Sequence, residues 1–144
     1  MNRHWDKEEL YKEWDLKTYK HWHVALSTRQ HTLGSCIIFC LREGVWKFSE
    51  LSSEEILELQ EVHKELESVL YKTFPNWHVN YCQYGNKLEM FHEHVIPRYR
   101  QAMLKFDCLW TDPKPTSLPV WSSVNIKNKE LLSLIKQEIL ENYT

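Results

Sequence analysis

The middle of the chain, from Ser52 to Phe74, carries a pattern that predicts one long helix. Ser52 and Glu55 are spaced as a capping box, in which each side chain bonds the backbone N–H of the other residue. Pro75 follows Phe74 and ends the helical pattern. A helix with one apolar stripe must pack that stripe against another layer, so its neighbours along the chain should supply one. The stripe recurs at intervals of three and four residues, at Leu59, Val62, Leu66, Val69 and Leu70.

Short apolar runs on both sides of this helix predict the strands of that layer. Residues 21–26 alternate between apolar and other residues, and residues 35–41 are apolar almost throughout, as expected of a strand covered on both faces. After the helix, residues 78–84 predict a third strand and residues 89–96 a fourth. Gly85-Asn86 between them predicts a turn.

The remaining segments complete an α+β pattern. Residues 6–17 predict a short amphipathic helix, residues 111–119 hold three of the five prolines and predict a loop, and a final helix is expected at roughly 127–142. The chain has 144 residues and shows no internal repeat, so we expect a single domain over 1–144. The predicted fold is a mostly antiparallel sheet with a long helix packed on it and a C-terminal helix.

Charge and hydrophobicity exclude several classes of function. The formal net charge is −2, so no general basic field favours nucleic acid, and a bound anion would need a local site. No N-terminal apolar segment precedes a cleavage-like site, and no apolar run reaches the roughly 18 residues that span a bilayer. We therefore expect a cytoplasmic protein with no membrane and no nucleic acid as partner.

The cysteines predict structural thiols. Their spacings match no C-x-x-C zinc pattern, and most of them lie in apolar or aromatic runs, where a free cysteine behaves as a small buried hydrophobe. A reduced compartment agrees with this use of cysteine. The four residues are Cys36, Cys40, Cys82 and Cys108.

Two histidines stand two residues apart in the stretch MFHEHVIPRY (90–99). In a strand, His92 and His94 project side by side, while Glu93 faces the other way. They could be surface residues, or metal ligands joined by the second H-x-H pair at residues 21–23. They could also form a catalytic pair, in which one imidazole attacks or shuttles a proton and the other polarises an anion.

The surrounding residues favour the catalytic interpretation through a resemblance. The stretch NYCQYGNKLEMFHEHVIPRY (80–99) resembles the histidine triad family of nucleotide hydrolases and transferases. The family signature is three histidines alternating with apolar residues, followed in many bacterial members by Val-Ile-Pro-Arg-Tyr. Met90, His92 and His94 occupy the three triad positions. QHTLG (30–34) resembles the turn before the family's second core strand, and the match runs over about residues 20–100, leaving 105–144 as a C-terminal extension.

The resemblance implies a role for each matching residue. His92 would be the nucleophile that attacks the α-phosphate and forms a nucleotidyl-histidine, and His94 would bind and polarise the phosphate oxygens. The backbone carbonyl of Met90 would accept a hydrogen bond that orients His92. Either Gln83 or Asn86 would contact the phosphate, although both also fit plain strand and turn positions.

The chain also departs from the family pattern. Met90 replaces the first triad histidine, Ser35 stands where many members carry a histidine, and Glu93 is acidic where an apolar residue is common. Arg98 fits either a phosphate clamp or a brace at the strand end. Solvated or packing roles are expected for the histidines without a nameable partner, at His21, His31, His63 and His78.

The expected function is hydrolysis of a nucleotide phosphoanhydride or phosphoramidate, with a dinucleoside polyphosphate such as diadenosine tetraphosphate as the first substrate implied by the resemblance. We expect no resident cofactor or metal, with Mg²⁺ entering only as an ion bound to the substrate. The resemblance also implies a homodimer. The alternatives are a nucleotide-binding module without catalysis and a histidine metal site.

Overall fold

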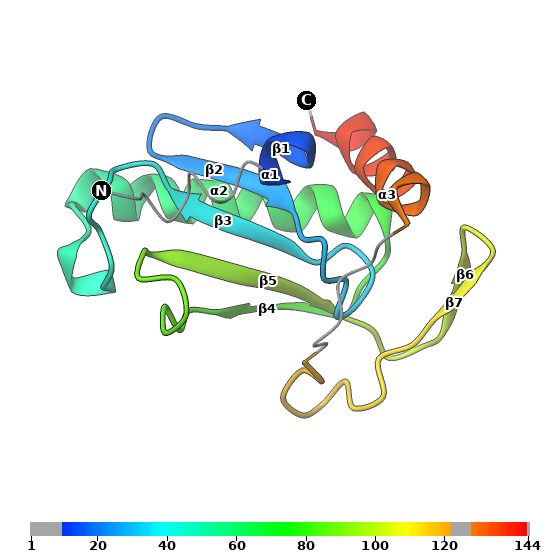
Figure 1. Cartoon of the computed structure of the whole chain (residues 1–144). Coiled ribbons are helices and arrows are strands. Elements are labelled where there is room, and N and C mark those ends of the chain that lie inside the picture. Colours follow the sequence, from blue (N-terminus) through cyan, green and yellow to red (C-terminus); the bar gives the residue numbers. More distant parts are fainter. Residues whose placement is uncertain (1–9, 122–127, 144) are drawn as a thin grey trace.

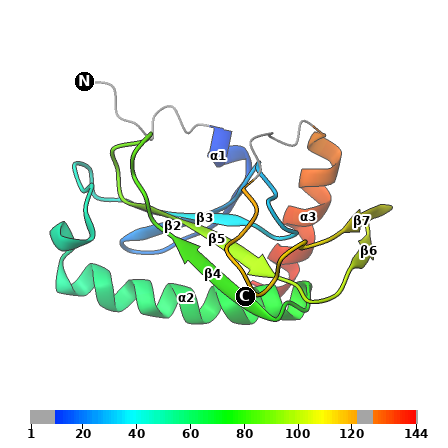
Figure 2. The same ribbon diagram turned by 90° about the horizontal axis from the view of Figure 1, so that it is seen from below.

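The computed structural model describes residues 10–121 and 128–143, whose main element is a five-stranded antiparallel sheet with a long helix along one face (Figures 1 and 2). The strand order is β1-β2-β3-β5-β4, and every neighbouring pair runs antiparallel. This arrangement confirms the expected α+β class. The strands are β1 (Asp15–Thr18), β2 (Trp22–Leu26), β3 (Cys36–Cys40), β4 (His78–Cys82) and β5 (His92–Arg98).

The long helix α2 spans Ser53–Thr73 and forms as its sequence predicts. Ser52 is the N-cap: its Oγ accepts from the Glu55 N–H at 3.1 Å, and its own N–H donates to Glu55 Oε1 at 2.7 Å. The predicted apolar stripe is buried against the sheet. Capping and burial together therefore fix both the start and the rotation of this helix.

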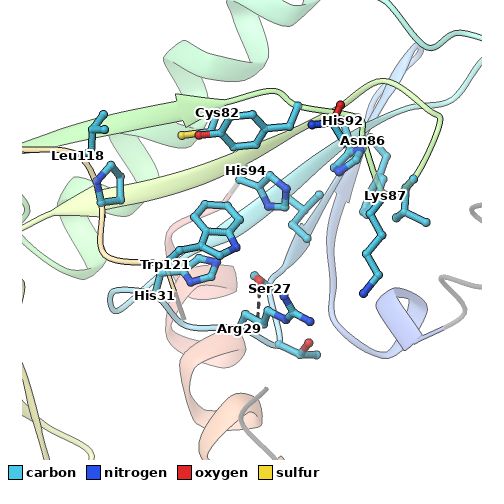
Figure 3. Close-up of a pocket in the computed structure, with 17 residues that line it drawn as sticks. Ser27, Arg29, His31, Cys82, Asn86, Lys87, His92, His94, Leu118 and Trp121 are labelled. Atoms are coloured by element: carbon cyan, nitrogen blue, oxygen red, sulfur yellow. Dashed lines mark hydrogen bonds between the residues drawn. The ribbon is translucent and has the colours of Figure 1, made fainter. Parts of the chain in front are cut away.

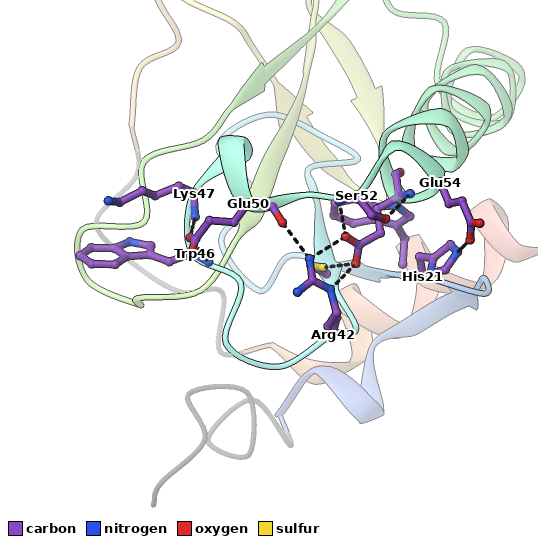
Figure 4. A network of polar contacts seen from close by, with 10 residues as sticks. His21, Arg42, Trp46, Lys47, Glu50, Ser52 and Glu54 are labelled. Carbon is purple, nitrogen blue, oxygen red and sulfur yellow. Dashed lines mark hydrogen bonds and ion pairs between the residues drawn. The ribbon is translucent and has the colours of Figure 1, made fainter.

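The buried Glu55 carboxylate also joins α2 to the loop after β3, through Arg42. Figure 4 shows Arg42 among the polar contacts around Ser52. Arg42 donates from Nε to Glu55 Oε2 at 3.1 Å and from Nη2 to Oε1 at 2.9 Å. These bonds from Arg42, together with the capping bonds of Ser52, lower the pKa of Glu55 to about 2. A short 3-10 helix, Phe48–Glu50, lies in the same connection.

The start of the fourth predicted strand was wrong by three residues, because β5 begins at His92 and not at residue 89. The Phe91 N–H donates to the Val45 carbonyl at 2.8 Å, and the Phe91 carbonyl accepts from the Cys40 N–H at 3.2 Å. These bonds hold residue 91 against the end of β3 and the loop after it. Met90 consequently precedes the strand, whereas His92 and His94 lie within it.

The predicted helix over residues 6–17 was also wrong in its second half. The described part has a four-residue helix, α1 (Leu10–Glu13), followed by β1, which pairs with β2; residues 6–9 lie outside the described ranges. Trp14 and Leu16 are both buried, so the apolar residues here follow the period of a strand. Pairing with β2 outweighs the local helical pattern.

A hairpin and a terminal helix follow the sheet. Strands β6 (Met103–Lys105) and β7 (Cys108–Trp110) were not predicted, and they project from the main sheet in Figure 1. Their turn residues, Phe106 and Asp107, have φ values of 55° and 57°, as a type I′ turn requires, but they lack the usual glycine or asparagine signal. Helix α3 (Lys129–Asn142) packs on α2 and β1. It was predicted to begin near residue 127, which lies outside the described residues, and the described helix begins two residues later.

The four cysteines are all free thiols, of which Cys36 and Cys40 are buried and the other two are partly buried. Burial raises the pKa of Cys40 to about 11. Within residues 10–121 and 128–143, no helix is long and apolar enough to cross a membrane.

Candidate active site

The sheet face turned away from α2 holds a cavity of about 670 Å³. Ile37 and Phe39 of β3 line it, together with Leu88 from the loop between β4 and β5. His92 and His94 of β5 line the same cavity (Figure 3). The two histidines of the H-x-H pair therefore lie in one concave site with apolar side chains beside them.

His92 is held in one orientation by a backbone group. Its Nδ1–H donates to the Met90 carbonyl at 2.9 Å, which fixes the tautomer in which Nε2 carries the free electron pair. The ring also stacks on Phe39, with centroids 6.0 Å apart. Only 6% of His92 is exposed, and this burial lowers the pKa of its imidazole, against the opposing effect of the bond to Met90. A neutral imidazole with Nε2 unprotonated can act as a nucleophile at neutral pH.

His94 lies beside His92, with ring centroids 5.1 Å apart and planes inclined by 73°. Burial is the main cause that lowers the pKa of His94 to about 4. The nearby His31 and Arg29 act in the same direction, as does His92. A neutral His94 can still donate one N–H to an anionic oxygen.

Glu93, the residue between them, points to the other face of the sheet. Its Oε1 lies 2.6 Å from His63 Nε2, and the His63 ring stacks on Tyr81 at 3.7 Å between centroids. Glu93 therefore contacts α2 and takes no part in the cavity, as its alternation with the histidines predicts. This contact also gives His63 a packing role.

Comparisons with known proteins place this geometry in a known fold. No family model matches the chain, and no curated protein does. A histidine triad protein from Sinorhizobium meliloti superimposes with a TM-score of 0.70 and 20% identity over 93% of each chain. One from Bradyrhizobium japonicum gives 0.68 with 14% identity, over 94% of this chain and 96% of that one. A hypothetical histidine triad nucleotide-binding protein from Sulfolobus tokodaii gives 0.68 with 14% identity, over 90% and 83% of the two chains.

The chain has the histidine triad fold. The resemblance first seen in residues 20–100 thus extends to the architecture of nearly the whole chain, including the extension after residue 105.

Two positions of the histidine triad pattern carry other residues here. The Met90 side chain packs in a small apolar cluster with Ala25, Ile37 and Phe39. Ser35 is buried, and its Oγ donates to the Thr32 carbonyl at 2.8 Å, which closes the turn before β3. Both side chains therefore serve packing or turn geometry.

The two residues expected near the phosphate are placed differently. Asn86 lines the cavity, in the loop that follows β4. Gln83 is not among the lining residues, although Cys82 and Tyr84 on either side of it are. Between them, Asn86 is the one whose position permits contact with a molecule in the cavity.

His31 is a residue of the cavity that the sequence interpretation missed. It was expected in a solvated or packing role, but it lines the cavity and stacks on Trp121, with centroids 4.1 Å apart. The Trp121 ring in turn meets His94 edge to face at 4.8 Å. Burial lowers the pKa of His31 to about 4, with a further contribution from Arg29. The only sequence signal was the place of His31 within QHTLG.

Arg98 braces the fold. Its side chain is buried, and Nε donates to Asp112 Oδ2 at 2.7 Å while Nη1 donates to the Ser117 carbonyl at 2.6 Å. Further bonds reach Asn80 and the Lys114 carbonyl. Arg98 thus fixes the segment that leads to Trp121. Because Arg98 does not line the cavity, the interpretation of Arg98 as a phosphate clamp was wrong.

Electrostatically the cavity suits an anion. Among the described residues that line it, Arg29 and Lys87 are cationic, and none is Asp or Glu. Within the described ranges, no group of three or more His, Cys, Asp or Glu residues could hold a metal ion. His21 lies near Glu54, and His23 contacts Asp15, so neither joins the pair in β5.

Proposed function

We propose that this protein is a nucleotide hydrolase or nucleotidyl transferase that acts through a covalent intermediate on His92. The observation that carries the proposal is the 2.9 Å bond between His92 Nδ1 and the Met90 carbonyl, because it leaves Nε2 as the nucleophilic atom in a cavity. The histidine triad fold supports the same assignment. A hypothetical histidine triad nucleotide-binding protein from Sulfolobus tokodaii shares this fold.

In this proposal the reaction has two steps. His92 Nε2 gives its electron pair to the α-phosphorus, and the bond from phosphorus to the leaving oxygen or nitrogen breaks, with the electron pair going to the leaving group. A leaving nitrogen takes up a proton from solvent, and a leaving phosphate departs as its anion. Water then attacks phosphorus and gives one proton to solvent, the phosphorus–Nε2 bond breaks, and the electron pair returns to His92. His94 donates an N–H to a non-bridging oxygen in both steps.

The substrate in this proposal is a nucleoside 5′-phosphoanhydride or phosphoramidate. The apolar side chains of Ile37, Phe39 and Leu88 offer a surface for the nucleoside, and the cationic residues compensate phosphate charge. A dinucleoside polyphosphate is the first substrate to test. We also propose, from the family resemblance, a homodimer in the cytoplasm, with Mg²⁺ present only as an ion of the substrate.

A second candidate is a binding module that holds a nucleotide without turning it over. The observation that favours it is the apolar packing of Met90 at the first triad position, which removes one imidazole from the site.

Formation of the intermediate tests the proposal. Wild type, His92→Ala and a control, His78→Ala, are mixed with diadenosine tetraphosphate or adenosine 5′-phosphoramidate, and nucleotide release and an acid-labile phosphoramidate are measured. His78 is exposed and lies outside the cavity. We expect turnover by wild type and control, and a loss of at least about a thousandfold in His92→Ala. Equal nucleotide binding by all three without turnover would establish the binding module.

A further inference from the structure

The charge of a phosphate-bearing ligand in this cavity must be balanced by groups other than the histidines. Burial lowers the pKa of His92 and brings those of His31 and His94 to about 4, so all three imidazoles are neutral at pH 7. Neutral imidazoles donate hydrogen bonds but bring no net positive charge. A ligand with several negative charges therefore requires other cations.

Arg29 and Lys87 are the cations that line the cavity within the described residues. They come from separate segments: Arg29 lies in the connection between β2 and β3, and Lys87 in the loop between β4 and β5. In Figure 3 both side chains lie on the same side of the cavity, and Lys87 extends toward the edge where Arg29 lies. Two loops that are far apart in sequence thus bring two positive groups to one cavity.

Among the described residues, the wall of the cavity brings no negative charge beside this pair. No carboxylate lines the cavity in the described parts of the chain, and none there forms an ion pair with Lys87. Arg29 is held at its backbone, where its N–H donates to Ser27 Oγ at 3.1 Å, and it lies near enough to His31 and His94 to lower the pKa of both. The positive charge of Arg29 therefore acts on the imidazoles of the site.

We propose that Arg29 and Lys87 are specificity-determining residues, which select ligands that carry further negative charge beyond the α-phosphate over ligands that carry only one phosphate. The inference rests on the proposed function, because it takes the cavity as the site of a nucleoside 5′-phosphate. In a substrate, the extra charge belongs to the leaving group, such as a polyphosphate chain. Arg29 offers a planar fork of donors for phosphate oxygens, and Lys87 offers a compact ammonium group.

Ligand binding without turnover tests this selection. The dissociation constants of AMP and adenosine 5′-tetraphosphate are measured by calorimetry for wild type, Arg29→Gln and Lys87→Gln. Each variant should bind the tetraphosphate about tenfold more weakly, as expected for a lost charged hydrogen bond, and AMP less than about threefold more weakly. Arg29→Lys should recover part of the loss, because it keeps the charge. The control, Lys64→Gln, removes an exposed charge from α2 on the other face of the sheet and should change neither constant.

The outcomes separate this inference from the proposed function. An equal loss for both ligands, or no loss for either, would overturn the selection by Arg29 and Lys87. Wild type that binds neither ligand would overturn both proposals. The variants could lose affinity for the tetraphosphate selectively while the wild type forms no covalent intermediate on His92. That result would support the inference and overturn only the covalent mechanism.

Discussion

The imidazole of His92 is oriented by the backbone of Met90, while the side chain of Met90 packs elsewhere. The Met90 carbonyl accepts from His92 Nδ1 at 2.9 Å, and the Met90 side chain lies among Ala25, Ile37 and Phe39. Every residue offers this carbonyl. The orientation of the His92 imidazole is therefore independent of which side chain stands at residue 90.

Met90→Leu tests this independence. Leucine is apolar and close to methionine in volume, so the free energy of unfolding should fall by less than about 1.5 kcal/mol. The carbonyl bond to His92 remains, and kcat/KM should stay within about threefold of wild type. Urea unfolding and steady-state kinetics measure the two quantities. A large loss of activity in a fully folded Met90→Leu protein would show that the methionine side chain itself acts in the site.

Met90→His supplies the contrasting variant. It introduces the histidine that the histidine triad pattern has at this position, but it places a polar ring in the apolar cluster, where an unpaired buried polar group costs about 1–3 kcal/mol. We expect a lower urea midpoint and no gain in kcat/KM. Higher activity in this variant would instead show that the cluster rearranges to accept the imidazole.

The pH dependence of activity should follow the lowered pKa of His92. An imidazole attacks only when Nε2 is unprotonated, which requires a pH above its pKa. Because burial lowers that pKa below the ordinary 6.5, the group stays unprotonated to lower pH than a solvent-exposed histidine. The acid limb of kcat/KM, which reports the free enzyme, should have its midpoint below pH 6.5. A profile measured between pH 4.5 and 8 with a midpoint at or above 6.5 would contradict this assignment.

The parts of the fold that local patterns determine were predictable from the sequence. The capping pair Ser52 and Glu55, the apolar stripe of α2 and the alternation of His92 and His94 all depend on residues within a few positions of each other. The first segment failed because Asp15–Thr18 gains its hydrogen bonds from β2, and no local pattern records that pairing.

The rest of the site depends on contacts between distant segments. His31 and Trp121 are separated by 90 positions, and their rings stack 4.1 Å apart. Arg98, at the end of β5, holds the segment that leads to Trp121 through Asp112 and Ser117. Neither the histidine nor the tryptophan has neighbours in the sequence that mark it as part of a cavity. Motif reasoning therefore found the pair in β5 and missed the residues that cover it.

Arg98 should be among the most sensitive positions for stability. Its guanidinium and the Asp112 carboxylate are both 1% exposed, so Arg98→Ala leaves a buried carboxylate without its partner. The expected loss is about 3–5 kcal/mol in the free energy of unfolding, measured with urea. Asp112→Asn with intact Arg98 should also destabilise the protein, and Lys64→Ala on the exposed face of α2 should not. A loss below about 1 kcal/mol for Arg98→Ala would show that the segment 112–117 is held by other contacts.

Trp121 should control the pKa of the two histidines that it touches. Its ring stacks on His31 at 4.1 Å and meets His94 at 4.8 Å, and burial is the main reason that both imidazoles have a pKa of about 4. Trp121→Ala exposes both rings to water, which stabilises their protonated forms, so both pKa values should rise toward 6.5. Titration of the imidazole C–H signals by NMR measures this directly. Trp77→Ala removes an exposed tryptophan outside the cavity and should leave both values unchanged. Unchanged values in Trp121→Ala would mean that the sheet, and not the segment held by Arg98, keeps water from these histidines.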